Sequence, residues 1–322
     1  MRFVVIGVGA IGGTVAGALA LAGHDVAGIA RGPHLAALQA GGLILHTVAG
    51  RRVARFPCFG DPAAADLRKD DVIMLAIKTQ HTGAALEQLR AAGWRDQPVF
   101  CLQNGVENER LALRYGADVH GVTVMLPADH VTPGEVAAFG TPNIGAFHLG
   151  RWSGGSDAID TAVANTLTGA GIASFVQVDV AASKYGKLLM NLGNVVEAAL
   201  GSAARKGPLG TRIRAEGQAV LAAAGIAWRD LDNTEIGGGE LMKTGEIKGV
   251  ARVGSSSSQS LARGAGSIET DYLNGEIVLL GGLNGIPTPV NAYFCRLAAR
   301  MVREGMAPGS VPIAEVELAL GV

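Results

Sequence analysis

The chain of 322 residues is poor in cysteine and in long apolar runs, and each shortage excludes a class of protein. Its cysteines, Cys58, Cys101 and Cys295, are odd in number and far apart, which argues against a disulfide framework or a zinc site. No stretch reaches the roughly 18 uninterrupted apolar residues that a membrane helix needs. The apolar N-terminus is interrupted by glycines and has no cleavage-like site, so a signal peptide is not expected. We therefore expect a cytoplasmic protein without a membrane partner.

Charge is also scarce. Only 17% of the residues are charged, the formal net charge is -1, and the basic residues are scattered, so no strong field attracts a nucleic acid. The seven histidines form no pair at metal-binding spacing on a helix, and we expect no metal. What the sequence does contain is apolar residues, 48% of a chain that exceeds the usual size of one core. This combination predicts a folded protein of two domains.

The first part of the chain alternates short apolar runs with stretches of helical periodicity. Expected strands include RFVVI, DVAGIA, DVIMLAI, PVFCLQ and VHGVTVML, and expected helices include AIGGTVAGALALAG, PHLAALQAG, TGAALEQLRAAG and ERLALRYG. This alternation predicts an α/β fold with a doubly wound parallel sheet that helices cover on both faces. Additional strands in VAAFGTPNIGAFHLG and SFVQVDV are expected to close that sheet.

After Val180 the apolar residues follow helical spacing, and strand signals are few. Examples are ASKYGKLLMNLGNVVEAAL, TRIRAEGQAVLAAAGIA, DYLNGEIVLLGGLNG and VNAYFCRLAARMVREG. We expect a first domain over residues 1–179 and an all-helical second domain over 180–322. The junction is expected near Asp179 to Ala181.

A glycine-rich loop follows the first expected strand directly and opens the first expected helix. Its residues are Gly7, Val8, Gly9, Ala10, Ile11 and Gly12. The order G-x-G-x-x-G in this context is the dinucleotide-binding fingerprint of a Rossmann-type domain, where the pyrophosphate lies at a helix N-terminus. The alternative is a chance match in a chain with 47 glycines, and the strand-loop-helix context argues against it.

The end of the second strand indicates which dinucleotide is bound. An NAD site usually has Asp or Glu there, about 20 residues after the glycines, to bind the ribose 2′-hydroxyl. Here the strand is followed by Arg31, and its only carboxylate, Asp25, stands at its beginning. A guanidinium is a bidentate partner for the 2′-phosphate of NADP(H). The sequence therefore favours NADP(H), with a merely solvated arginine as the alternative.

Taken together, several motifs resemble one family, the ketopantoate reductases or 2-dehydropantoate 2-reductases. They are GVGAIGG, Arg31, LAIKTQ with Lys78, LQNGVENE with Asn104, SKYGKLLMNLGN and IETDYLNG with Glu269, in the family's order from about residue 2 to 300. The resemblance implies NADPH-dependent reduction of a 2-oxo acid, most specifically 2-dehydropantoate to pantoate in pantothenate biosynthesis. The implied partner is this small molecule. The oligomeric state is left open, with a homodimer as the candidate.

The same resemblance assigns roles to residues. Lys187 resembles the general acid that protonates the carbonyl oxygen as hydride arrives, and Glu269 the carboxylate that positions the substrate or the lysine. Asn104 resembles an asparagine near the nicotinamide and the reacting carbonyl, and Lys78 resembles a cofactor-side residue.

The residues around Lys187 agree with such a role. On one helix, Lys187, Asn191 and Asn194 would share a face, and a proton donor there suits a carbonyl oxygen that gains charge. The alternative is the solvated side of an amphipathic helix, which Lys184 would extend equally well.

Two departures from the family concern the substrate. The family's second helix asparagine falls on Val195, so either Asn194 substitutes for it or a substrate contact is lost. This chain has one extra residue between Arg263 and Glu269 relative to the family pattern. Allowing for it places the family's site serine at Ser256, whereas an ungapped count places it at Ser257. The serine run Ser255 to Ser258 could equally cap a helix that begins near Gln259.

Three functions follow from these observations. The leading one is a ketopantoate reductase. The second keeps the fold and the chemistry but takes another 2-oxo acid, or an imine formed from one, and the Val195 departure keeps it open. The third is an NADP-binding sensor without catalysis, which the joint presence of Lys187, Asn104 and Glu269 argues against.

Overall fold

The computed structural model describes residues 1–116, 118–231, 241–264 and 266–321. The chain forms two compact units. Unit 1 contains Met1–Gln103, Glu107–Lys184 and Asp230–Ala251, and unit 2 contains Asn104–Val106, Tyr185–Arg229 and Arg252–Val322. The sequence predicts a single junction near residue 180. In the structure, Asn104–Val106, which precedes that junction, belongs to unit 2, and Asp230–Ala251, which follows it, belongs to unit 1.

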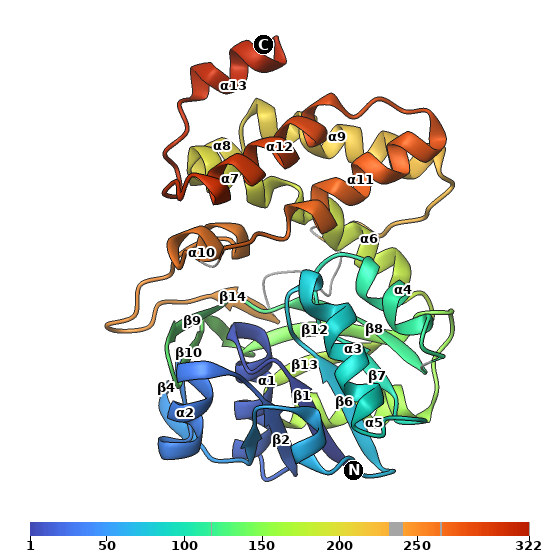
Figure 1. Cartoon of the computed structure of the whole chain (residues 1–322), viewed down its shortest axis with the longest axis vertical. Coiled ribbons are helices and arrows are strands. Elements are labelled where there is room, and N and C mark those ends of the chain that lie inside the picture. The colour runs from blue at the N-terminus through green and yellow to red at the C-terminus, as the bar shows by residue number, and fades with distance from the viewer. Residues whose placement is uncertain (117, 232–240, 265, 322) are drawn as a thin grey trace. The chain divides into compact units, whose positions relative to one another are not determined.

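Unit 1 is built on an eight-stranded sheet in the order β13-β12-β8-β7-β6-β1-β2-β5 (Figure 1). Its strands are β1 (Arg2–Ile6), β2 (Val26–Ile29), β5 (Cys58–Phe59), β6 (Asp71–Leu75), β7 (Val99–Cys101), β8 (Val119–Met125), β12 (Gly145–Arg151) and β13 (Ile172–Val176). Neighbouring strands are parallel, except that β12 runs antiparallel to β8. The predicted α/β class with a mostly parallel N-terminal sheet is confirmed.

Helices cover both faces of the main sheet, because its strands are apolar on both faces. The helices of unit 1 are α1 (Ala10–Leu21), α2 (Gly32–Gly41), α3 (Thr82–Ala91), α4 (Glu107–Leu113) and α5 (Ala158–Gly169). Alternate β1 side chains point to opposite faces. Phe3 packs in the core that includes α1 and α5, and Val4 packs in the core that includes α3 and α4.

One part of the strand prediction is wrong. The segment after β8 does not simply close the main sheet. Its strands β9 (Ala128–Thr132) and β10 (Glu135–Ala138) join β3 (Leu43–Thr47) and β4 (Gly50–Ala54) in a separate sheet of order β4-β3-β10-β9. Strand β11 (Gly140–Pro142) pairs instead with β14 (Met242–Thr244), which lies in the part of the chain expected to be helical. These pairings join segments far apart in sequence, which local patterns do not reveal.

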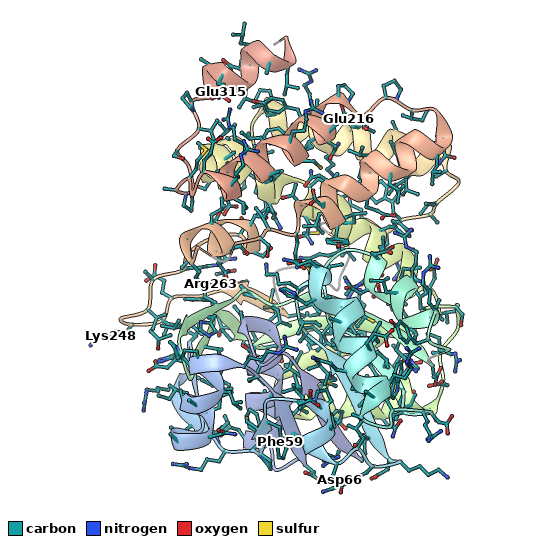
Figure 2. The ribbon with its side chains drawn as sticks, in the orientation of Figure 1. Phe59, Asp66, Glu216, Lys248, Arg263 and Glu315 are labelled. Carbon is teal, nitrogen blue, oxygen red and sulfur yellow. The ribbon has the colours of Figure 1, made fainter. Side chains whose placement is uncertain are left out.

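Unit 2 is helical, as predicted. Helix α6 (Val180–Asn191) begins in unit 1 and continues into unit 2. The others are α7 (Gly193–Leu200), α8 (Ser202–Arg205), α9 (Pro208–Ala223), α10 (Ser256–Ala262), α11 (Thr270–Asn284), α12 (Pro289–Arg303) and α13 (Ile313–Leu320). Glu216 on α9, labelled in Figure 2, accepts hydrogen bonds from the backbone N–H groups of Val290 and Asn291 at 2.8 and 3.0 Å. It thereby satisfies the first turn of α12 from outside that helix.

Within the described residues, no helix is both long and apolar enough to span a membrane. The three cysteines are free thiols. Burial raises the pKa of Cys58 to about 11 and that of Cys295 to about 12, and burial also raises the pKa of Cys101. Since the thiolate is the reactive form, these thiols are poor nucleophiles near neutral pH.

Candidate active site

The glycine loop lies at the topological switch point of the main sheet. From β1 the chain passes to β2 on one side, and β6 later pairs with β1 on the other, which is where doubly wound sheets bind ligands. Gly7 has a φ of 97°, and an added side chain would meet Ile77 on the loop after β6. A side chain at Gly12 would overlap the Gly7 carbonyl oxygen. Glycine is required at both positions by the turn and by the close approach of the backbone.

Gly9 differs from its two neighbours in the motif. It is the N-cap of α1, and a Cβ added to it would have no atom within 4 Å. The protein itself therefore does not need glycine here, whereas a pyrophosphate approaching the backbone would. This open space at a helix N-terminus fits a dinucleotide. The residues predicted to bind it, Gly7 to Gly12, are the loop after β1 and the first turn of α1.

Arg31 and Lys78 follow the two strands, β2 and β6, that pair with β1 on either side. Arg31 follows β2 as the N-cap of α2, is exposed, and donates a hydrogen bond to Gln88 Oε1 on α3 at 2.8 Å. Because the Gln88 side chain is uncharged, this hydrogen bond orients the Arg31 guanidinium without neutralising its positive charge. Lys78 follows β6 and is half-buried. Asp25 lies before β2, at the opposite end of that strand from Arg31, and pairs with Arg68 at 2.9 Å.

In unit 2, three asparagine side chains form a hydrogen-bonded chain. Asn194 Nδ2 donates to Asn191 Oδ1 at 3.5 Å, and Asn191 Nδ2 donates to Asn104 Oδ1 at 2.9 Å. Asn191 and Asn194 are almost fully buried, and Asn104 is half-buried. In this orientation Asn104 accepts through Oδ1, which leaves Nδ2 as the donor atom of its amide. The structure thus connects the sequence-predicted asparagines, although they lie up to 90 residues apart.

The one helix expected through Lys187, Asn191 and Asn194 is divided into two helices at a single residue, although Asn191 and Asn194 still lie side by side. Helix α6 ends at Asn191, and α7 begins at Gly193. The intervening Leu192 keeps helical dihedral angles, φ -56° and ψ -33°, and its carbonyl oxygen accepts a hydrogen bond from Asn274 Nδ2 at 3.1 Å.

Sequence reasoning missed Asn274, which is 1% exposed and also donates to Asn291 Oδ1 at 3.0 Å. Its place in the IETDYLNG motif was the available signal.

Lys187 and Glu269 lie on the elements that border the asparagine chain. Lys187 is half-buried on α6, one turn before Asn191. Glu269 is 7% exposed and is the N-cap of α11. The loop that carries Asn104 packs on the first turn of this helix, because a Cβ on Gly105 would lie 2.9 Å from the carbonyl oxygen of Tyr272. Unit 2 therefore assembles the end of α6, the start of α11 and the loop 104–106 around Asn104.

The alternative in which Lys184 and Lys187 share the solvated side of an amphipathic helix is wrong for Lys184. It is 2% exposed, and its ammonium lies 2.7 Å from Glu109 Oε1 on α4 and donates to the Gln103 carbonyl oxygen at 2.6 Å. Glu109 is fully buried, and this burial raises its carboxyl pKa while the lysine opposes the rise. Lys184 thus holds the residue before Asn104. Sequence reasoning missed Glu109, whose role depends on a contact 75 residues away.

One serine of the run occupies the N-cap of a helix, and the others lie in the first turn of that helix. Helix α10 begins at Ser256 rather than near Gln259, and Ser255 is its N-cap. Ser255 also donates through its backbone N–H to Glu197 Oε1 at 2.6 Å. Ser256 is half-buried and Ser257 is 3% exposed, and neither side chain takes part in this capping. Both stay candidates for the substrate-binding serine.

Val195, at the position of the family's second asparagine, is 1% exposed in the apolar core of unit 2. Asn194 is 5% exposed and instead reaches the Asn191 side chain. The structure thus places an asparagine amide beside Asn191 from the neighbouring position. Whether that amide replaces a substrate contact is still a prediction.

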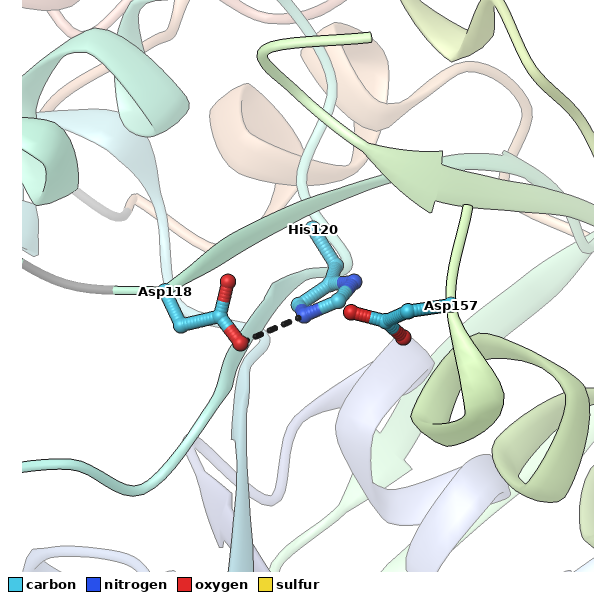
Figure 3. Close-up of side chains that lie close together, drawn as sticks. All are labelled: Asp118, His120 and Asp157. Carbon is cyan, nitrogen blue, oxygen red and sulfur yellow. Dashed lines mark ion pairs between the residues drawn. The ribbon is translucent and has the colours of Figure 1, made fainter. Parts of the chain in front are cut away.

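A separate polar group in unit 1 consists of Asp118, His120 and Asp157, whose ligand atoms lie within 4.8 Å of one another (Figure 3). Arg151 binds both carboxylates, at 2.9 Å to Asp118 Oδ1 and 2.7 Å to Asp157 Oδ2. His120 Nδ1 is bonded to Asp160 Oδ1 at 2.7 Å. Because a guanidinium already neutralises both carboxylates, we interpret the group as a structural charge network rather than a cation site.

Comparisons with known proteins relate the whole chain to one family. The model of the ketopantoate reductase PanE/ApbA family matches residues 3–154, and the model of its C-terminal part matches residues 179–302. The 2-dehydropantoate 2-reductase of Mesorhizobium japonicum is 31% identical over 336 residues, which cover 94% of this chain and 98% of that protein. The corresponding protein of Pyrococcus horikoshii is 27% identical over 318 residues, covering 96% and 100%.

Solved structures show the same fold. A PanE/ApbA family ketopantoate reductase from Ralstonia eutropha has a TM-score of 0.78 at 27% identity and covers 95% of this chain and 99% of its own. D-mandelate dehydrogenase in complex with NADH and anilino(oxo)acetate also has a TM-score of 0.78 with the same coverage, but at 21% identity this shows the fold alone. The two family models and the full-length relatives lead to one conclusion: the chain belongs to the ketopantoate reductase PanE/ApbA family.

Proposed function

We propose that the chain is a cytoplasmic, NADPH-dependent enzyme that reduces 2-dehydropantoate to pantoate in pantothenate biosynthesis. The observation that carries the proposal is the hydrogen bond of 2.9 Å between Asn191 and Asn104, one helical turn from Lys187. It connects the segment of the proposed proton donor with the amide proposed to bind the reacting carbonyl. The glycine loop with its open space at Gly9 supports the dinucleotide.

The proposed chemistry follows from the charge that develops on the substrate. When bound, NADPH supplies the hydride that reduces the ketone carbon. The Lys187 ammonium donates a proton to the carbonyl oxygen, which gains negative charge during the reaction. The Nδ2 group of Asn104 donates a hydrogen bond to the same oxygen, and Glu269 positions the substrate or the lysine. The hydroxyl of Ser256 or Ser257 is proposed to bind the substrate, as are Asn191 and Asn194.

Val195 favours keeping a second candidate, a different 2-oxo acid or an imine formed from one. Its buried valine side chain has no hydrogen-bonding group where the family has an asparagine. A substrate with one polar group fewer than ketopantoate would not need the hydrogen bond that the missing asparagine would have made.

The two candidates are separated by measuring NADPH oxidation with a panel of 2-oxo acids that includes ketopantoate. The proposal expects kcat/KM for ketopantoate to exceed that for the other acids. A higher value for another acid would select the second candidate. No oxidation with any acid, despite tight NADPH binding, would support the sensor instead.

Arg31 is expected to determine the cofactor preference. The Arg31→Ala variant should lose about tenfold to a hundredfold in NADPH affinity, since a charge-assisted hydrogen bond contributes ~1.5–3 kcal/mol. NADH affinity should change little, because NADH has no 2′-phosphate. Titration of both cofactors checks this, with the exposed Arg95→Ala as the matched control. Equal affinities for NADPH and NADH in the unmodified protein would contradict the assignment.

Gly9→Ala tests the pyrophosphate site. The free protein has room for the methyl group, so we expect its melting temperature to stay unchanged. NADPH affinity should fall about tenfold or more, because overpacking a contact typically costs ~1–3 kcal/mol. Gly83→Ala on α3 is the control, since it also adds a methyl group to open space. A Gly9→Ala protein that binds NADPH normally would place the pyrophosphate elsewhere.

A further inference from the structure

The imidazole of His34 joins three segments of unit 1 at the glycine loop. His34 is the third residue of α2, three positions after Arg31. Its Nε2 atom lies 2.6 Å from the carbonyl oxygen of Val8, the residue between the first two glycines of the loop. Its Nδ1 atom accepts a hydrogen bond from the backbone N–H of Gly134, in the turn between β9 and β10, at 2.9 Å. One side chain thus ties the loop to the helix that Arg31 caps.

These partners determine the state of the ring. A backbone N–H can only donate, so Nδ1 is an acceptor, and a carbonyl oxygen can only accept, so Nε2 carries the proton. His34 is therefore the neutral Nε2–H tautomer. A second proton would have to occupy Nδ1, where it would face the Gly134 N–H. Burial lowers the pKa of His34 from its ordinary value, which favours the same neutral form near pH 7.

Other titratable groups lie around His34. From β9, His130 directs its Nε2 atom at His34 Nδ1 at 3.2 Å, with the ring centroids 4.7 Å apart. Next to Gly134, Glu135 is bonded to His46 Nε2 at 2.7 Å. The glycine loop presents a backbone carbonyl. His130 is thus a titratable side chain in direct contact with the ring.

Fixing the Val8 carbonyl also fixes the next backbone N–H. The peptide bond between Val8 and Gly9 is planar, so its N–H points away from its C=O. Holding the Val8 oxygen at His34 therefore orients the N–H of Gly9, the N-cap of α1 at the open space described above. Backbone N–H groups at such a helix start bind phosphate.

We propose that His34 is a positioning residue for the dinucleotide: its neutral ring, anchored at the Gly134 N–H, holds the Val8 carbonyl and with it the glycine loop in the binding conformation. Protonation of Nδ1 sets an N–H against that of Gly134 and displaces the ring from this anchored position. The inference rests on the proposed function, because it requires a bound dinucleotide. Affinity should be retained above the pKa of His34 and lost as the pH falls through it, in a range below the ordinary value of about 6.5. The sign follows from the bond to Gly134, which only the neutral ring accepts.

The experiment is calorimetric titration of NADP⁺ and NAD⁺ between about pH 5 and pH 8 into the full-length protein. Both oxidised cofactors are used because the 2′-phosphate itself titrates near pH 6, and NAD⁺ has none. We expect wild-type affinity to fall ~5-fold to 10-fold in acid, the value of one neutral hydrogen bond. In His34→Ala the affinity should already be lower by that factor at pH 8 and should not change further with pH for NAD⁺.

His34→Gln is the decisive variant. Its amide has an NH2 donor group and a carbonyl acceptor in place of the two ring nitrogens, but it does not titrate. It should bind near wild type at pH 8 and lose the acid dependence. The exposed His24→Gln is the control and should keep it. The inference is overturned if His34→Gln and His34→Ala both match wild type, or if His130→Gln alone abolishes the acid dependence. Wild-type protein that binds neither cofactor would instead refute the proposed function.

Discussion

Lys187→Ala is expected to lower kcat about 100- to 10,000-fold, because removing a general acid typically has this effect. NADPH affinity should stay within about twofold of wild type, since the glycine loop belongs to unit 1 and Lys187 to unit 2. Steady-state kinetics with ketopantoate and a separate NADPH titration measure the two quantities.

The choice of control matters for this variant. Lys184 lies one turn earlier on the same helix, but its buried ion pair would confuse loss of activity with loss of stability. The exposed Lys206 in unit 2 is a better match, and Lys206→Ala should leave kcat unchanged. Lys187→Arg adds a second test, because arginine keeps the charge but does not release a proton near neutral pH. If Lys187→Arg retained full kcat, the lysine would provide charge and not a proton.

The parts of the fold that the sequence predicts are those determined locally. Strand β1 was predicted from RFVVI with its exact bounds, because a run of β-branched and aromatic residues followed by Gly7 has few other structures. The glycine loop follows from the same short segment, since all its residues are contiguous. Arg31 was found at the end of β2 for the same reason.

The parts that the sequence does not predict depend on contacts between distant segments. Strand β10 pairs with β3 across about 90 residues, and no local signal distinguished it from a strand of the main sheet. The one-residue interruption between α6 and α7 lies at Leu192, whose carbonyl oxygen accepts a hydrogen bond from Asn274 on another helix. His34 falls in the expected helix PHLAALQAG, but its bonds to Val8 and Gly134 join segments far apart in the sequence and so leave no local signal.

The same limitation applied to Lys184, which the pattern placed beside Lys187 and the structure places in a buried ion pair. The Nζ–Oε1 distance to Glu109 is 2.7 Å, and the side chains are 2% and 0% exposed. Removing one partner of such a pair leaves the other charge buried, which typically costs ~3–5 kcal/mol. We therefore expect Lys184→Ala to destabilise unit 1 by about that amount in urea unfolding followed by tryptophan fluorescence.

The pH dependence of the stability of Lys184→Ala separates the effect of the buried charge from a loss of packing. Burial raises the pKa of Glu109 above that of the unfolded chain, and Lys184 opposes this rise. Without the lysine the pKa should rise further, so the folded variant binds a proton that the unfolded chain releases above pH ~4.5. A raised carboxyl pKa gives stability that is present at acid pH and is lost as the pH increases. The deficit of Lys184→Ala should therefore be larger at pH 8 than at pH 5.

A double variant completes the cycle. Glu109→Leu with Lys184→Met removes both charges and keeps similar volumes, a change that is often neutral or stabilising for a buried pair. We expect it to recover most of the stability that either single change loses. Recovery of kcat is not expected to the same extent, because Met has no ammonium to hold the Gln103 carbonyl oxygen, which Lys184 binds at 2.6 Å next to Asn104. If the double variant were as unstable as Lys184→Ala, and the deficit of Lys184→Ala did not depend on pH, the lost hydrogen bond to the Gln103 carbonyl oxygen would explain the effect instead of the buried charge.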